Sequence, residues 1–324
     1  MPSPALDPPR QAPLTLLASD RLAMAGDLDT VPVIDRARRG AVAVRVRPGL
    51  HRRAEPGPSG PLILEAVQRG AQVEIAVWGC PSTPPGDRQR ALDDARGWIG
   101  WCDDPPDLAE LTAGHRTLQH AARRVGVVRL SRLPRVQEAV GRAVLGQLVQ
   151  GIEARRSTSQ LAAAIGQPAT HDLWCWPTST TLGRTPAYAM RRCGISLRGA
   201  TALHASAMDD PQLERVRADF GALDRRLRAI RGIGVWTSAE TRLALGDPDA
   251  VSVGDDNLYE TVCHGLAGTR PEECSDELML ELLEPYRGQR GRVIRLVVRA
   301  VGQRLLPRLR RRAPRAALST HRYW

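Results

Sequence analysis

The chain has 324 residues, of which 42% are hydrophobic and 25% charged, so it can bury one or two ordinary cores and is not a disordered polymer. At roughly 100 to 200 residues per domain, two domains are expected. The sequence contains no run of about eighteen apolar residues, and it begins without the basic-then-apolar pattern of a secretory signal. We therefore expect a cytoplasmic protein with no membrane partner.

All of the basic charge comes from arginine. The sequence contains no lysine, and its 46 basic residues stand against 35 acidic ones, for a formal net charge of +11. From Pro285 to the end there are twelve arginines and no aspartate or glutamate. Because a guanidinium matches phosphate with a bidentate fork, this block favours a nucleic-acid partner. The alternative is that arginine replaces lysine throughout and the block is an ordinary solvated surface.

The cysteines are too widely spaced for the common metal sites. They form no C-x-x-C pair and no compact group of four. We interpret them as reduced, buried thiols, and we expect no metal and no cofactor. The six positions are 80, 102, 175, 193, 263 and 274.

The first part of the chain is expected to form an extension and a small domain. Residues 1–28, rich in proline and alanine, are typical of a flexible N-terminal extension. Partly β-branched stretches at 40–46, 61–67 and 72–78 are separated by proline-rich and glycine-rich segments, which predicts a small sheet of three or more strands. We assign residues 29–125 to a small α+β N-terminal domain.

The rest of the chain is expected to be helical. Val136, Val140 and Val144 recur near a 3.6-residue period, and similar patterns continue toward the C-terminal region. We assign residues 126–312 to a helical domain and 313–324 to a basic C-terminal tail. The predicted fold class is therefore mostly α, with the small α+β domain at its N-terminus.

Residues 285–309 have the pattern of an amphipathic helix. Apolar residues repeat at helical spacing on one face. Arg292, Arg295 and Arg299 form a stripe at positions i, i+3 and i+7. The pattern predicts a helix with one apolar side and one basic side.

A tight turn between two helices is the most informative segment. In residues 227–240 (LRAIRGIGVWTSAE), a helical run stops at Gly232, turns through Ile233 and Gly234, and restarts with Thr237 in the first turn. The glycines leave no side chain between the turn and a partner, so main-chain N–H groups at the start of the second helix can point at a phosphate. The alternative is an ordinary helix corner that uses glycine for tight packing.

A carboxylate follows this hairpin at the start of another helix, in residues 245–258 (LGDPDAVSVGDDNL). Here the sequence resembles the helix-hairpin-helix DNA glycosylase superfamily, whose signature is a G-I-G hairpin followed by an aspartate in a V-G-D-x-x-L-like run. More narrowly, it is similar to the 3-methyladenine DNA glycosylase II family. Residues 142–149 (RAVLGQLV) and 284–287 (EPYR) agree with that family as well. The resemblance covers 126–312 and implies an all-helical glycosylase domain.

The resemblance implies hydrolysis of the N-glycosidic bond of a flipped, damaged nucleotide, as in base excision repair. The V-G-D-x-x-L register selects Asp255 as the catalytic carboxylate that stabilises the cationic sugar, with Asp256 as the competing candidate. A helix N-cap is a second role open to Asp255. The family's wedge position, which fills the gap left by the flipped base, falls on Leu148, beside Gln147. Without the resemblance, Leu148 reads as an ordinary core leucine.

The resemblance also implies where the base pocket lies. The family's aromatic position falls on Trp236, whose electron-rich face suits a cationic alkylated purine of the 3-methyladenine and 7-methylguanine class. Tyr259 is a candidate second wall, with core packing as the alternative. The sequence departs from the family in three places: Arg231 stands where a proline often precedes the hairpin, Glu240 replaces an aromatic residue, and Arg295 stands where a second tryptophan is expected. Such a pocket is expected to recognise a base differently from a fully aromatic one.

The absence of lysine bears on the type of reaction. Bifunctional relatives carry, at the position of Trp236, a lysine that forms a Schiff base with the sugar. We therefore expect a monofunctional, water-using glycosylase that acts as a monomer on double-stranded DNA with damaged bases and is associated with the nucleoid. One alternative is a DNA-binding protein of this fold that is inactive or differently specific. Another is a basic structural or RNA-binding protein dominated by its arginine block.

Overall fold

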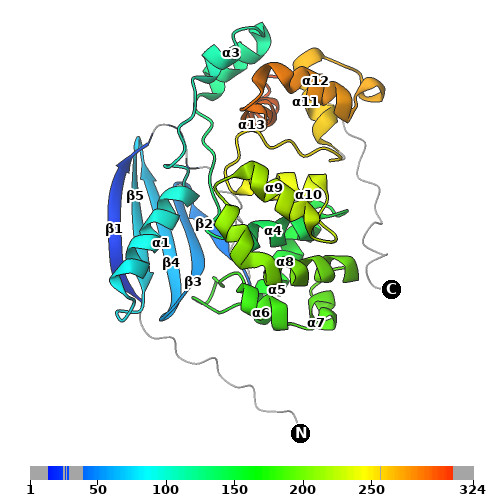
Figure 1. The fold of residues 1–324 in the computed structure, drawn as a ribbon. Helices are drawn as coiled ribbons and strands as arrows, with labels where there is room; N and C mark the ends of the chain where they lie inside the picture. The colour runs from blue at the N-terminus through cyan, green and yellow to red at the C-terminus, as the bar shows by residue number, and fades with distance from the viewer. Residues whose placement is uncertain (1–13, 25, 27, 29–38, 256, 309–324) are drawn as a thin grey trace.

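A five-stranded antiparallel sheet lies beside a larger helical body (Figure 1). The computed structural model describes residues 14–24, 26, 28, 39–255 and 257–308. The strands are arranged in the order β1-β5-β4-β3-β2. Their bounds are β1 (Thr15–Ala23), β2 (Ala43–Arg47), β3 (Leu50–Gly57), β4 (Gly60–Arg69) and β5 (Gln72–Gly79).

Tight turns set the register of the sheet. Arg69 pairs with Gln72 across a two-residue turn in which Gly70 has φ +62°, a left-handed conformation that favours glycine. On β5, Val73, Ile75 and Val77 are all buried, as expected for alternate positions on one face of a strand. That face packs against helix α1 (Pro85–Trp98), which forms a layer over the sheet.

The five strands agree with the predicted sheet of three or more strands. The three predicted stretches correspond to β2, β4 and β5, but β1 and β3 were missed. The interpretation of residues 1–28 as a flexible extension is wrong for 15–23, which pair with β5 along the edge of the sheet. Leu22, Met24 and Leu28 are buried in the layer between sheet and α1, which explains why this segment is ordered. Residues 1–13 lie outside the described part of the chain.

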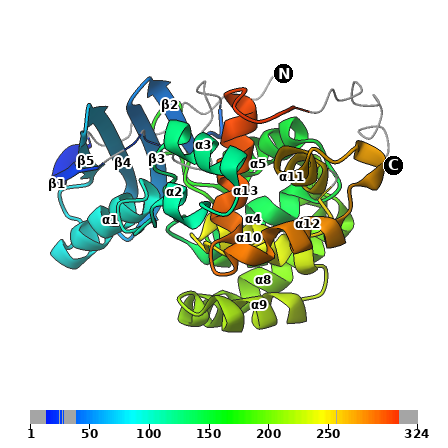
Figure 2. The same cartoon turned by 90° about the horizontal axis from the view of Figure 1, so that it is seen from above.

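The helices other than α1 form two clusters, each with its own buried core. The central cluster contains α4 to α10, and the C-terminal cluster contains α2, α3 and α11 to α13. In Figure 2, α13 lies beside α3 and α11. The helices of the central cluster are α4 (Val136–Gly146), α5 (Gly151–Ile165), α6 (Ser179–Arg184), α7 (Ala187–Arg192), α8 (Leu197–Val216), α9 (Phe220–Ala229) and α10 (Val235–Ala244). Those of the C-terminal cluster are α2 (Leu108–Leu111), α3 (Arg116–Val125), α11 (Leu258–Ala267), α12 (Asp276–Leu283) and α13 (Arg290–Gly302), with short 3-10 helices at Pro271–Glu273 and Glu284–Tyr286.

One feature of this arrangement corrects the domain boundary predicted at residue 126. The predicted boundary at residue 126 groups α2 and α3 with the sheet, whereas Leu108, Leu118 and Ala122 are buried against α11 to α13. The reason is that α2 and α3 are too short to bury their apolar faces alone. The tail predicted for 313–324 lies outside the described residues.

The basic side predicted for the helix within residues 285–309 is also wrong in part. On α13, Arg292 is buried and forms an ion pair with Asp103 at 2.7 Å, and it also donates a hydrogen bond to the carbonyl of Val128. Arg295 is also largely covered, while Val298 is 49% exposed. These two arginines therefore join α13 to other segments of the same protein instead of forming a solvated stripe.

A group of buried charged residues joins the sheet to α4. Arg53 on β3 is fully buried, and its Nη2 atom lies 2.6 Å from Oε2 of Glu138 on α4. Arg53 also pairs with Glu55, and Arg142 pairs with Glu138 at 2.7 Å. A buried charge is tolerated only when it is paired, so this group fixes how β3 lies against α4.

The cysteines are unpaired, but not all of them are buried. Cys175, Cys193 and Cys263 are buried as expected, whereas Cys102 is exposed. Cys80 and Cys274 are half-buried. Among the described residues, no helix is long and apolar enough to cross a membrane.

Candidate active site

The predicted hairpin connects α9 to α10. Ile230 and Ile233 are buried and anchor the turn to the central cluster, and the N–H of Ile233 donates to the carbonyl of Ile230 at 3.0 Å. Gly232 has φ +95°, and a Cβ at this position would come within 3.1 Å of the Cβ of Ala202 on α8. Both the backbone conformation and the close approach of α8 therefore require glycine here.

The second glycine has a different environment. Gly234 is the N-cap of α10, its φ of −98° suits any residue, and a Cβ here would meet open space. No side chain caps α10, so the first N–H groups of the helix have no partner within it and carry the positive end of the helix dipole. This uncapped helix start has the chemistry of an anion site.

Gln147 fixes the end of α4 against the hairpin. Its Nε2 atom donates to the carbonyl of Gly232 at 2.9 Å and to Oγ1 of Thr237 at 2.8 Å. The next residue, Leu148, is 91% exposed and has φ +54°. The alternative that Leu148 is a core leucine is therefore wrong, and the loop after α4 presents a large apolar side chain to solvent beside the hairpin.

Asp255 lies at the start of α11 and is held on both carboxylate oxygens. Oδ1 accepts hydrogen bonds from the main-chain N–H groups of Asn257 and Leu258, each at 3.0 Å. Oδ2 accepts a hydrogen bond from Nε1 of Trp236 at 3.2 Å. The helix-capping role and a fixed position beside Trp236 therefore occur together in Asp255.

Trp236 is half-buried in the first turn of α10, where it lies between Asp255 and the end of α4. A Cβ added to Gly146 would come within 3.1 Å of its ring, so Gly146 leaves the space that the indole occupies. The first turn of α10 thus contacts the loop that carries Leu148 on one side and Asp255 on the other.

Glu240 and Arg295 lie next to this group. Glu240 follows Trp236 by one turn of α10, and its Oε1 atom accepts a hydrogen bond from the hydroxyl of Ser252. Burial raises the pKa of Glu240, and the nearby Asp255 raises it further, while Arg295 on α13 opposes this rise. Burial lowers the pKa of Arg295, and its Nε atom is buried without a hydrogen-bond partner. A largely covered carboxyl group and a largely covered guanidinium therefore lie near each other without forming a direct ion pair.

The other predicted site residues differ in whether their side chains are exposed beside the site. The side chains of Ile233 and Thr237 are 5% and 3% exposed, so the expectation that these residues bind DNA can concern only their main chain. Arg231 is exposed. Tyr259 is half-buried against the C-terminal cluster, which fits core packing better than a pocket wall. Asp256, the competing catalytic candidate, lies outside the described residues.

Ser252 is a site residue that sequence reasoning missed. It is 2% exposed and orients the carboxyl group of Glu240. In the sequence, Ser252 is marked only as a polar residue between two valines, shortly before Gly254 and Asp255. A buried hydroxyl needs a partner, but the sequence does not indicate which one.

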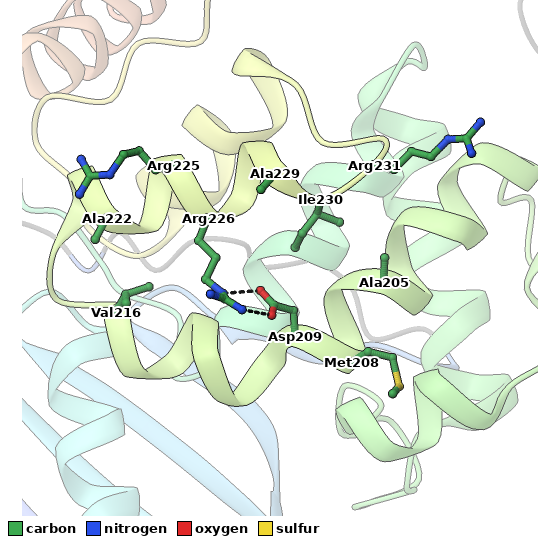
Figure 3. Close-up of a pocket in the computed structure, with 10 residues that line it drawn as sticks. All are labelled: Ala205, Met208, Asp209, Val216, Ala222, Arg225, Arg226, Ala229, Ile230 and Arg231. Atoms are coloured by element: carbon green, nitrogen blue, oxygen red, sulfur yellow. Dashed lines mark hydrogen bonds and ion pairs between the residues drawn. The ribbon is translucent and has the colours of Figure 1, made fainter.

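A separate groove of about 810 Å³ lies between α8 and α9, beside the hairpin. Figure 3 shows Asp209 and Arg226 joined as an ion pair inside it, while Arg225 and Arg231 point outward at its two ends. Asp255 and Trp236 are not among its lining residues, so the groove is distinct from the candidate active site.

Comparison with known proteins identifies the fold. No family model and no curated protein matches the chain. Among solved structures, it is similar to a 3-methyladenine DNA-glycosylase from Archaeoglobus fulgidus, with a TM-score of 0.70 and 18% identity over 86% of this chain and 96% of that one. It is also similar to an 8-oxoguanine glycosylase/lyase from Clostridium acetobutylicum in complex with double-stranded DNA, with a TM-score of 0.60 and 11% identity over 79% of this chain and 86% of that one.

A third match is a 3-methyladenine DNA glycosylase from Schizosaccharomyces pombe in complex with abasic DNA, with a TM-score of 0.53 and 18% identity over 63% of this chain and 100% of that one. The chain therefore has the fold of the helix-hairpin-helix DNA glycosylases. The predicted fold class, mostly α with a small α+β part at the N-terminus, is confirmed.

Proposed function

We propose that this protein is a DNA glycosylase that hydrolyses the N-glycosidic bond of a damaged, flipped nucleotide, with Asp255 as its catalytic residue. The observation that carries the proposal is the grouping around the first turn of α10. An uncapped helix start, an exposed Leu148 and a fixed carboxylate are joined there through Gln147 and Trp236. Each of these parts serves one step of base excision.

The hairpin and Leu148 serve DNA binding. The free N–H groups at the start of α10 bind one backbone phosphate, and the bare surface at Gly234 allows the strand to approach them. Leu148 occupies the space in the duplex that the extruded nucleotide leaves. The partner is double-stranded DNA, which one copy of the chain is sufficient to bind.

Asp255 serves the chemical step. As the bond between C1′ of the sugar and the base nitrogen breaks, positive charge develops on the sugar, and a fixed carboxylate stabilises it. Water then adds to C1′, and the departing base retains the bonding electrons. Hydrogen bonds from Trp236 and from the start of α11 hold the carboxylate in position, so little reorganisation is needed when charge develops.

The reaction is monofunctional, and its substrates are alkylated purines of the 3-methyladenine and 7-methylguanine class. The sequence contains no lysine to form a Schiff base with the sugar, and Trp236 stands at the position where bifunctional relatives carry one. Two of the similar structures are 3-methyladenine glycosylases, which supports this substrate class. An alkylated purine is cationic and leaves readily, so a pocket without a strong general acid is sufficient.

The test is base release from methylated duplex DNA, resolved by base, for the wild type and for Asp255→Asn. We expect the wild type to release 3-methyladenine or 7-methylguanine, and the variant to be slower by about 100-fold or more with duplex affinity retained. Asn keeps the size of the side chain, and its one carbonyl oxygen can still accept the two main-chain hydrogen bonds from the start of α11, while its amide nitrogen cannot accept the bond from Trp236. Binding by both proteins without release of any base would instead favour a DNA-binding protein of this fold without glycosylase activity.

A further inference from the structure

The Glu240 carboxyl group has one oxygen fixed and one available. Oε1 accepts the hydrogen bond from the buried Ser252, which orients the group. Among the described residues, Oε2 takes part in no hydrogen bond, and the Glu240 side chain as a whole is half-buried. A second acid thus lies one helical turn beyond Trp236, with one carboxylate oxygen that no described residue bonds.

The charges around Glu240 are arranged in order along α10. Trp236, in the first turn, binds Asp255, and Glu240 follows one turn later. Arg295 reaches the carbonyl of Leu243, nearer the end of the helix, through Nη2 at 3.4 Å. Glu240 therefore lies between Asp255 on the catalytic side and Arg295 on the far side, and these two charges oppose each other in their effect on its ionisation.

A base bound near Trp236 and Asp255 lies on the Asp255 side of Glu240, away from Arg295. A cationic base there brings a positive charge to the side of Glu240 that otherwise faces only another carboxylate. That charge favours the ionised form of Glu240, and the attraction is strong because the site is largely desolvated. A neutral base does not gain this attraction. The preference therefore depends on the charge of the base and not on its shape.

We propose that Glu240, oriented by Ser252 and backed by Arg295, is the residue that makes this pocket select cationic bases over neutral ones. This inference rests on the proposed glycosylase function and adds a carboxylate to the aromatic face of Trp236 as the basis of selectivity. Glu240 acts on the choice of base, whereas Asp255 acts on the sugar. The two residues are therefore separable by experiment.

The experiment measures single-turnover release from duplexes that carry a cationic base, 7-methylguanine, and from duplexes that carry a neutral one, hypoxanthine. For Glu240→Gln, which keeps the size and the bond to Ser252, we expect the ratio of cationic to neutral release to fall on the order of 10-fold. Glu240→Asp retains the charge, so this variant should still release the cationic base faster than the neutral one. Ser252→Ala removes the orienting hydroxyl but no charge, and should change the ratio less than Glu240→Gln.

The outcomes separate this inference from the proposed function. If Glu240→Gln slows release of both bases equally, or leaves both unchanged, Glu240 does not select by charge, and the glycosylase function stands. If the wild type releases only 7-methylguanine, no ratio can be formed, and the rates of 7-methylguanine release by the two variants are compared instead. The inference requires that Glu240→Gln releases this base more slowly and that Glu240→Asp does not. If the wild type releases no base of either kind, both proposals are overturned. Circular dichroism of each variant shows whether the fold is retained.

Discussion

Leu148 has a local structure that the fold itself does not require. Its φ of +54° is a left-handed conformation that costs a residue with a Cβ about 1–2 kcal/mol. Burial of a leucine contributes about 1.5–3 kcal/mol, and this side chain, 91% exposed, forgoes nearly all of it. Gln147 nevertheless fixes the position of the loop against Gly232 and Thr237. Both costs are explained if the side chain acts on a bound duplex.

Leu148→Ala should therefore separate stability from activity. We expect the free energy of unfolding to change by less than about 0.5 kcal/mol, because an exposed side chain is removed. Base release from damaged duplex should fall on the order of 10-fold, since nothing then fills the gap left by the flipped nucleotide. Urea unfolding and single-turnover release measure the two effects.

Leu197→Ala is the matched control, because Leu197 is 61% exposed at the start of α8 and is not part of the loop after α4. It should leave both stability and release unchanged. A large loss of stability in Leu148→Ala would mean that the leucine supports the fold after all. Unchanged release in that variant would remove Leu148 from the proposed mechanism.

The hairpin between α9 and α10 contains two glycines with different functions in the element. Gly232 is required for folding, because its φ is +95° and α8 lies against it. Gly234 is in an extended conformation with open space around it, so the fold would accept another residue there. A helix start left uncapped by the sequence is typical of a site where an external anion takes the place of the cap.

Substitutions at the two glycines should therefore have opposite effects. Gly232→Ala should lower the free energy of unfolding by more than about 1 kcal/mol. Gly234→Asp should raise it by about 0.5–1 kcal/mol, because the carboxylate caps α10 and favours the positive end of its dipole. The same carboxylate should weaken duplex binding on the order of 10-fold or more, because it occupies the proposed phosphate position.

The control for charge is Gly86→Asp, which adds the same carboxylate in the first turn of α1, next to the sheet, where a Cβ meets no neighbour. It should not change duplex affinity. Thermal unfolding and fluorescence anisotropy with a labelled duplex give the two readouts. Equal loss of affinity in Gly86→Asp and Gly234→Asp would indicate a general charge effect and no phosphate site at the hairpin.

At the scale of the whole molecule, the sequence predicts what depends on local pattern. Helix α4 was predicted from the period of its valines, and Val136, Val140 and Val144 are all buried. Strand β3 was missed because its buried positions include Arg53 and Glu55, which break the alternation of apolar and polar residues that marks a strand. What the sequence does not contain is the identity of partners that lie far apart along the chain.

The candidate site follows the same rule. The motif placed Asp255 and Trp236 in one site, but the hydrogen bond between them joins α10 to the start of α11 and has no local signal. The spacing of the arginines on α13 predicts a basic surface, because a periodic pattern does not distinguish a solvated arginine from a buried, paired one. Arg292 has its partner in Asp103, which lies on a distant segment of the chain.

The buried charges that join the sheet to α4 should make stability depend on pH. Burial raises the pKa of Glu55 from 4.5 to about 7, and Arg53 and Arg135 oppose this rise while Glu138 and Asp94 add to it. A carboxyl group whose pKa is raised by folding binds a proton more tightly in the folded state. The contribution of Glu55 to stability is therefore complete below about pH 4.5 and is lost as the pH rises to about 7.

Glu55→Gln should remove this dependence. Between pH 4.5 and 7, the free energy of unfolding of the wild type should fall relative to that of Glu55→Gln by more than about 1 kcal/mol. Urea unfolding across that range measures the difference in slope, and Glu272→Gln, an exposed residue of the C-terminal cluster, should follow the wild type. The pKa of Glu138 is lowered, mainly by Arg53 and Arg142 against the effect of burial, so its contribution is lost only at lower pH and does not cancel the effect. Parallel curves for the wild type and Glu55→Gln would mean that Glu55 keeps its charge through this range, and that the sheet is joined to α4 by a permanently ionised group.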